Sequence, residues 1–164
     1  GVAEGGVMDS IMTGYRDALV RGGKTDAQLG EGLSVGFHFH LAPTVEQAIK
    51  ESKGFYEENL KMFGPLRLHR GLTDEQIEIM GDPRRAPDGG LPSIEDAVKS
   101  QAFLAGPPER IIEQLKSVEK EYPALERIGV SHPMGTPQSV ITEQLEWFGK
   151  EVMPAFKGKV GANA

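Results

Sequence analysis

The sequence predicts an α/β fold in which parallel strands alternate with helices, and two observations carry this prediction. Residues 33–41 alternate between apolar and polar side chains, which is the period-two pattern of a half-buried strand. Further along, a short apolar run within residues 126–131 lies between two amphipathic segments of helical length. Because strands that are joined through helices are normally parallel, the chain is expected to form parallel strands with crossover helices.

The first helix is predicted over residues 7–20 and the first strand over residues 33–41. Apolar side chains recur at helical spacing in the helix, and a pair of glycines ends the pattern. In the strand, the alternation places the apolar side chains on one face. It places the two histidines, His38 and His40, on the other face.

The next region is predicted to be a capped helix followed by a long insertion. Thr44 and the glutamine three residues later form a capping-box pattern, which opens a helix over residues 44–62. Residues 65–105 are rich in turn-forming and charged side chains, and they are expected to form an insertion or lid. Within this insertion, a serine cap predicts a short helix over residues 94–104.

The last third of the chain is predicted to be a helix, a strand and a helix. Two prolines open a helix over residues 107–121, because a proline in the first turn loses no hydrogen bond. Residues 126–131 form the short buried strand, and residues 136–153 form the final helix. The apolar stripe predicted to be buried on the final helix consists of Ile141, Leu145, Phe148 and Val152.

Composition argues against several classes of function. The chain of 164 residues carries a net charge of −6, and its 18 basic residues are scattered, which argues against a nucleic-acid partner. The absence of cysteine excludes disulfides, thiolate nucleophiles and sulfur-ligated metals. No apolar run approaches the length of a membrane span, and no signal-peptide pattern is visible. The expected location is the cytoplasm.

Several short motifs in the last third resemble the C-terminal end of a known family. Gly106, Pro108 and Glu109 form a Gly-x-Pro-Glu helix start. Residues 128–133 form an apolar strand that ends near a histidine and a proline, and residues 151–154 read Glu-Val-Met-Pro. In this order and spacing, the motifs resemble the luciferase-like monooxygenases, a family of flavin-dependent (β/α)8 barrels.

The resemblance implies that residues 1–164 form a single partial-barrel segment, the C-terminal part of a TIM barrel, mostly helical with two parallel strands. Residues 7–20 would be the sixth helix, residues 33–41 and 126–131 the seventh and eighth strands, and residues 65–105 an active-site lid. A complete barrel needs roughly 250 residues, so strands one to five would be missing. Such a segment is expected to be inactive alone, and to form a homo-oligomer or pair with a companion N-terminal fragment.

The resemblance also implies a chemistry. Family members use reduced flavin mononucleotide (FMN), or in one branch a deazaflavin, to activate O2 for attack on a small organic substrate. Most of their flavin contacts come from strands that this chain lacks, so no cofactor-binding residue is assigned. Catalytic groups of such barrels lie at the carboxyl ends of strands, which makes His40 the first catalytic candidate, as a hydrogen-bond donor or proton shuttle. His38, deeper on the same face, is the second.

Three other interpretations stay open. Both histidines could be packed interior side chains, with His132 a simple loop residue. Alternatively, His38 and His40 could ligate zinc in a metallohydrolase, with His132 or Asp82 as the third ligand. Thirdly, the chain could be a non-catalytic interaction module, because two strands leave open sheet edges and too little cover for their large apolar side chains. Those side chains are Phe37, Phe39, Trp147 and Phe148.

Overall fold

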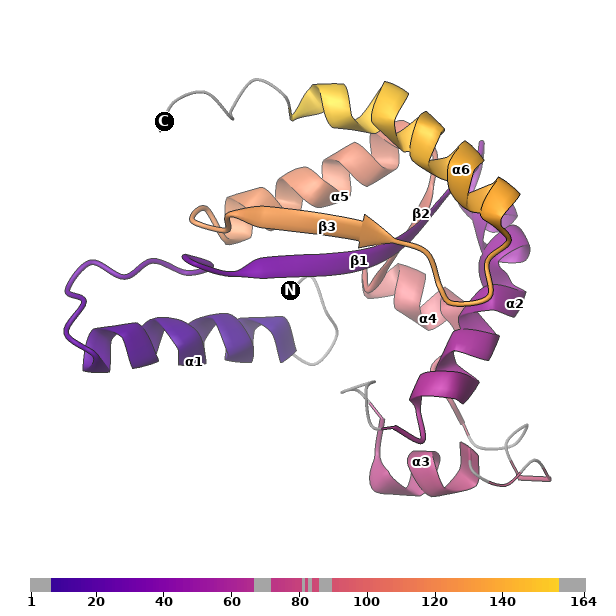
Figure 1. Cartoon of the computed structure of the whole chain (residues 1–164), viewed down its shortest axis with the longest axis horizontal. Helices are drawn as coiled ribbons and strands as arrows, with labels where there is room; N and C mark the ends of the chain where they lie inside the picture. The colour runs from indigo at the N-terminus through magenta and orange to yellow at the C-terminus, as the bar shows by residue number, and fades with distance from the viewer. Residues whose placement is uncertain (1–6, 67–71, 81, 83, 86–89, 157–164) are drawn as a thin grey trace.

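The computed structural model describes residues 7–66, 72–80, 82, 84–85 and 90–156, and it shows an α/β fold with a small parallel sheet (Figure 1). In chain order, the elements are α1 (Val7–Arg21), β1 (Ser34–Leu41), α2 (Val45–Phe63), α3 (Asp74–Met80), α4 (Ile94–Lys99), β2 (Phe103–Gly106), α5 (Pro108–Glu121), β3 (Arg127–Ser131) and α6 (Gln138–Trp147). A π-helical turn, η2 (Phe148–Val152), and a 3₁₀ turn, η3 (Met153–Ala155), continue α6. Within these residues, no helix combines the length and apolar character needed to cross a membrane.

The sheet has the strand order β2-β1-β3, and both pairings are parallel. On one side of β1, His38 pairs with Phe103, and the register continues to Leu41 with Gly106. On the other side, Ser34 pairs with Arg127, and the register ends where His38 pairs with Ser131. The predicted parallel pairing of the segments 33–41 and 126–131 is therefore confirmed.

The predictions for residues 65–105 were wrong in one respect, because these residues include most of a third strand. The predicted helix over residues 94–104 ends at Lys99, and Gln101 has a positive φ of 61° that turns the chain out of the helix. The buried residues Phe103–Gly106 then form β2. The sheet consequently has three strands rather than the predicted two, and the last part of the supposed insertion is core.

The strand order also bears on the expected barrel. In a (β/α)8 barrel, the seventh and eighth strands are neighbours, as β1 and β3 are here, but the expected insertion between them would add no strand on the other side of β1. Here β1 is the central strand, and the described residues form an open sheet. The structure therefore shows an α/β fold with parallel strands, without barrel closure in the part of the chain that it describes.

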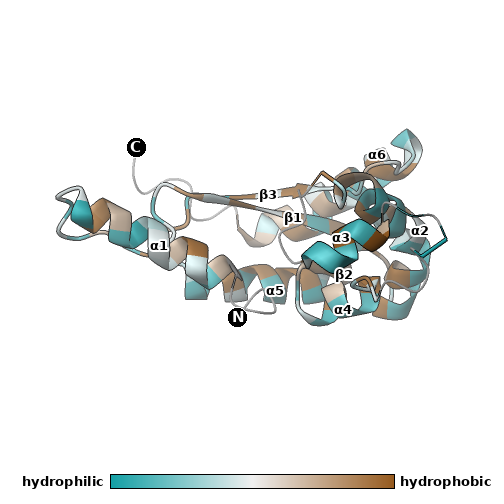
Figure 2. Ribbon diagram, turned by 90° about the horizontal axis from the view of Figure 1, so that it is seen from below, coloured by the Kyte–Doolittle hydropathy of each residue, from teal (hydrophilic) through white to brown (hydrophobic). Residues whose placement is uncertain are grey.

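Each face of the sheet packs against a different set of helices. Phe37, Phe39 and Leu41 point to the first face, where they form one core cluster with residues of α1, α5 and η2. Phe103 and Ala105 point to the second face, where they pack against α2 and α4. The alternation of hydrophobic and hydrophilic residues along α1 and α2 in Figure 2 is typical of helices that bury one side. The predicted separation of apolar side chains from histidines in β1 is confirmed by this arrangement.

The first helix lies alongside the amino-terminal ends of β1 and β3 in both views (Figures 1 and 2). Met12 of α1 is buried in the first-face cluster. The hydroxyl of Tyr122 donates a hydrogen bond to the carboxylate of Asp9, which connects α1 to the end of α5. A polar bond and an apolar contact thus hold α1 against the rest of the fold.

The predicted buried stripe of the final helix was wrong at Leu145, whose exposed fraction is 46%. Phe148 and Val152 are buried as expected. The cause is the π-helical turn over Phe148–Val152, which changes the number of residues per turn and therefore rotates the buried face. Before this turn, the helix instead buries Gln144.

Candidate functional site

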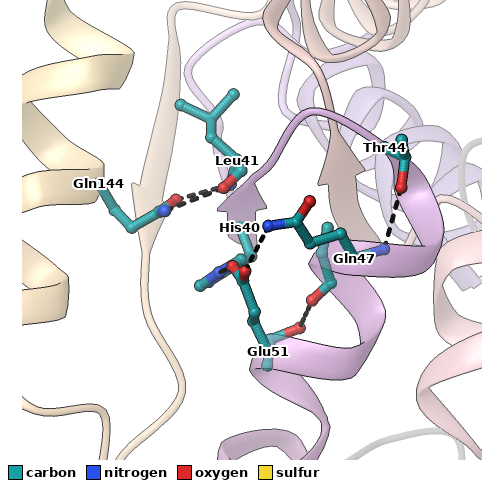
Figure 3. Close-up of polar contacts among 8 residues, drawn as sticks. His40, Leu41, Thr44, Gln47, Glu51 and Gln144 are labelled. Atoms are coloured by element: carbon teal, nitrogen blue, oxygen red, sulfur yellow. Dashed lines mark hydrogen bonds and ion pairs between the residues drawn. The ribbon is translucent and has the colours of Figure 1, made fainter.

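The candidate site lies at the carboxyl end of β1, between α2 and α6 (Figure 3). It is a cavity of about 550 Å³ whose lining includes His40 and the residues that follow it. The carboxyl ends of parallel strands are where α/β proteins usually bind ligands, because the helices that follow the strands leave room there. This location agrees with the region from which His40 was predicted to act.

Two helices supply the walls of the cavity through side chains at helical spacing. Gln47, Glu51 and Phe55 are four residues apart on α2, so they lie on one side of that helix. Val140, Glu143, Gln144 and Trp147 form the corresponding stripe on α6. The cavity is therefore built from one face of each helix.

The start of α2 places the first of these side chains. The Thr44 hydroxyl accepts a hydrogen bond from the backbone N–H of Gln47 at 3.1 Å, as the capping pattern predicted. The Gln47 side chain instead donates from Nε2 to Oε1 of Glu51 at 2.8 Å. Gln47 thus belongs to the cavity, where it fixes one oxygen of the Glu51 carboxylate.

His40 forms the buried floor of the site, with an exposed fraction of 4%. Its Nε2 lies 2.9 Å from Oε2 of Glu51 (Figure 3). The hydrogen bond from Gln47, and secondly the one from His40, hold the pKa of the Glu51 carboxyl below its usual value. Because an ionised carboxylate only accepts hydrogen bonds, Nε2 of His40 carries the proton. In the neutral ring, Nδ1 is then the acceptor.

Gln144 fastens α6 to the end of β1. The backbone N–H of Leu41 donates to Oε1 of Gln144 at 2.6 Å, and Nε2 of Gln144 donates to the Leu41 carbonyl at 2.9 Å (Figure 3). On the side of β3, the strand register ends at His38, so β3 does not extend along the last residues of β1. The buried Gln144 amide takes the place of a neighbouring strand at that position, because its donor and acceptor match those of a backbone peptide.

The other two histidines do not converge on His40. His38 is half-buried, and its ring meets the ring of Phe103 edge to face at 6.4 Å. His132 follows Ser131, the register partner of His38, so it lies on the opposite face of the sheet. There its ring packs against Phe39 at a centroid distance of 4.5 Å.

His132 is held in its neutral form. Burial lowers the pKa of its imidazole to about 4, and the nearby rings of His40 and His38 contribute to the same shift. Neither ring nitrogen has a hydrogen-bond partner of ordinary geometry in the described residues. The His132 ring therefore packs against the first face of the sheet, from the segment just after β3.

The zinc site considered from the sequence is not assembled. Among the residues that the structure describes, no three His, Cys, Asp or Glu side chains lie close enough together to hold a metal ion. His132 fails as a ligand because the strand alternation puts it on the wrong face. Asp82 lies in the connection after α3, where its carboxylate accepts a hydrogen bond from the backbone N–H of Arg84 at 2.9 Å.

Sequence reasoning identified His40 but missed most of its surroundings. Glu51 and Gln47 could have been found, because a helix that opens directly after a strand points its first turns toward that strand's carboxyl end. Gln144 and Trp147 had no comparable signal. Their place in the site depends on where β3 ends and on the phase of α6.

A second cavity of about 510 Å³ lies on the first face, between β3, α5 and the end of the chain's last helix. Its walls are mainly apolar, including Ile128, Val130 and Phe148, with Glu119 and Arg127 among its few charged residues. Among the described residues that line it, there is no histidine. We therefore place the candidate site at His40.

A scan against models of known protein families finds no match to this chain, and a search of curated proteins finds no significant relative.

Proposed function

We propose that this chain is the C-terminal segment of a luciferase-like flavin-dependent monooxygenase, an oxidoreductase that uses reduced flavin and O2 on a small organic substrate. The observation that carries the proposal is the pair formed by the buried His40 and the more exposed Glu51, at the carboxyl end of a parallel strand and lining a cavity. The Gly-x-Pro-Glu and Glu-Val-Met-Pro motifs that resemble this family add to it.

His40 and Glu51 have separate roles in this proposal. His40 meets the substrate and accepts or donates a proton at Nδ1, because Nε2 is engaged by Glu51. Glu51, fixed by Gln47, holds the ring in one tautomer and orientation. His38 lies deeper along the strand and supports the same face of the site.

The cavity alone does not fit FMN. In the part of the chain that the structure describes, its lining contains two carboxylates, those of Glu51 and Glu143, and no lysine or arginine that could hold the phosphate. In the proposal, the flavin is therefore bound mainly by a companion segment, and this chain by itself is inactive. Whether the companion's cofactor is FMN or a deazaflavin is an outcome of the test below.

The proposal requires one change in the sheet. β1 and β3 are neighbours, as the seventh and eighth strands of a barrel are, but β2 lies on the other edge of β1, where the sixth strand of a barrel would pair. Joining the companion segment must consequently move β2 away from β1. Completion of the barrel is then a rearrangement as well as an association.

The test is flavin-dependent O2 uptake by the protein isolated from its source with its natural partners. Reduced FMN and reduced deazaflavin are compared in parallel, with the isolated chain as reference. Reduced flavin consumes O2 without any protein, so each rate is compared with that of the same flavin alone. We expect uptake above this background with one of the two flavins, none above it with the isolated chain, and a loss of about 100-fold or more of the excess uptake in His40→Gln. The absence of flavin-dependent uptake from the natural protein would exclude the proposal.

A second candidate function, that of an interaction module, is favoured by the uncovered half of the sheet. Ser34, Gly36, Gly129 and Ser131 are exposed on the second face, and a methyl group at Gly36 would meet no atom within 4 Å. Parallel sheets are normally covered on both faces. We propose that a companion segment with further strands covers this half. The native mass of the protein from its source should then exceed the 17.8 kDa of the chain, and a multiple of 17.8 kDa would indicate self-association instead.

A further inference from the structure

The cavity at His40 carries a charge and an aromatic lining that together specify a class of ligand. Of the described residues that line it, the charged ones are Glu51 and Glu143, one from each helix, and none is a lysine or an arginine. Trp147 and Phe55, also one from each helix, are half-buried and add aromatic wall. We propose that this cavity binds an organic cation, specifically an alkylated ammonium group, between the aromatic rings and the two carboxylates.

The aromatic rings favour a cation over a neutral group of the same shape. The face of an indole or benzene ring is electron-rich, so it attracts an ammonium group whose alkyl substituents also make apolar contacts. Trp gives the strongest such interaction among the side chains, and recognition of quaternary ammonium by aromatic residues follows this chemistry. Val140, on the same face of α6 as Trp147, adds apolar contact for the alkyl substituents.

The carboxylate of Glu51 retains acceptor capacity for a ligand. A carboxylate has about four lone-pair sites, and Gln47 and His40 each use one. The Glu51 side chain is 43% exposed, so a ligand in the cavity can reach it. Glu51 is also kept ionised at neutral pH by the same two hydrogen bonds. An anionic ligand, in contrast, would meet two like charges in the lining, where a nearby cation, Lys50, already acts on Glu51 from outside the described cavity wall.

This inference deepens the proposed function, because it names the substrate class of the same site, an alkylated amine. It can nevertheless be tested without flavin or O2. Trp147 is the only tryptophan in the chain, so intrinsic tryptophan fluorescence reports on the cavity alone. Choline is a suitable probe, since 3,3-dimethylbutan-1-ol is its neutral isostere and 3,3-dimethylbutanoate is an anion of similar shape.

We expect choline to change the fluorescence of Trp147 saturably in the full chain. The neutral isostere should bind at least about tenfold more weakly, because it loses both the ring and the carboxylate attraction. The anion should cause no saturable change. Equal binding of choline and its neutral isostere, or no binding of choline, would overturn the inference.

Variants separate the ligand site from a general effect of charge. Glu143→Gln is exposed and should fold normally, and it should weaken choline binding several-fold. Glu51→Gln should weaken it further. The matched control is Glu126→Gln, which removes the same charge at the other cavity and should leave binding unchanged. If Glu126→Gln weakens binding as much as Glu143→Gln, the cavity is not the site.

The outcomes also distinguish this inference from the proposed function. Choline binding by a protein without flavin-dependent O2 uptake would keep the cation site and exclude the monooxygenase. Flavin-dependent uptake by a protein that does not bind choline would exclude the cation site and keep the monooxygenase. The two proposals therefore fail independently.

Discussion

The two ends of the sheet differ in how much of them is covered. At the carboxyl end of β1, Phe39 and Leu41 are fully buried on one face, and His40 is buried on the other. At the amino-terminal end, Ser34 and Gly36 are exposed on the second face. The difference shows that the fold concentrates its packing and its specific hydrogen bonds around the candidate site, and leaves one face of the far half of the same strands exposed.

Replacing core residues at the covered end should have the largest effect. Phe39→Ala removes a fully buried ring from the first-face cluster, and we expect a loss of about 3–5 kcal/mol in the free energy of unfolding. The matched change at the open end is Gly36→Ala, for which we expect a change within about 0.5 kcal/mol, because the new methyl group meets no neighbour. Urea unfolding measures both. Similar losses in the two variants would show that the open half is covered after all.

A disulfide between β1 and β3 at their amino-terminal ends should stabilise the less covered end of the sheet and test the pairing of these two strands. The chain contains no cysteine, so Ser34→Cys with Arg127→Cys introduces a single pair at exposed register partners. We expect the bond to form on oxidation and to stabilise the isolated chain by about 2–4 kcal/mol relative to the reduced form.

A nonbridging pair provides the control for this disulfide. Ser34→Cys with Ser131→Cys places the thiols four register steps apart, too far for a bond. In a barrel the seventh and eighth strands stay neighbours, so the bond should also form in the natural complex. A failure to form in the isolated chain would contradict the sheet described above.

Loss of the two hydrogen bonds between the Gln144 side chain and the Leu41 backbone should have the next largest effect on stability. Gln144→Leu keeps a similar volume but leaves the N–H and carbonyl of Leu41 without the partner that now satisfies them. We expect a loss of about 2 kcal/mol in the free energy of unfolding, since each buried unpaired group costs about 1–3 kcal/mol. The control is Gln138→Leu at the exposed start of the same helix, which should change stability by less than about 0.5 kcal/mol. Equal losses of stability in the two variants would mean that the Gln144 hydrogen bonds contribute nothing specific.

Local patterns predicted those parts of the fold that depend on neighbours in sequence. The alternation in residues 33–41 was long enough to identify β1, and the Thr44 cap identified the start of α2. In contrast, β2 has four residues, all buried, so it shows no alternation and its apolar run merged with the predicted helix before it. A strand that is buried on both faces gives no periodic signal of its own.

Of the side chains that form the candidate site, only His40 of β1 was predicted from the sequence to act there. His40 followed from its position near the end of β1, but the contribution of Gln144 depends on β3 ending opposite His38. The exposure of Leu145 likewise depends on a π-helical turn that no local pattern indicated. Both features are set by tertiary packing, which a single sequence does not specify.

The smallest expected effect is a pH dependence from His132, which packs on the face opposite the candidate site. Its folded pKa of about 4 lies below the usual 6.5 of histidine, so between these values the unfolded chain binds more protons than the folded chain. The stability that comes from this difference is fully present above pH 6.5, and is lost as the pH falls through 4. After allowance for the partial exposure of the ring, we expect the free energy of unfolding to change by about 1–2 kcal/mol across this window.

His132→Phe keeps the contact with Phe39 and should make the stability of the protein less dependent on pH between 4 and 6.5. Denaturant titrations at several pH values measure both slopes, and identical slopes in the two proteins would show that His132 titrates freely in the folded state.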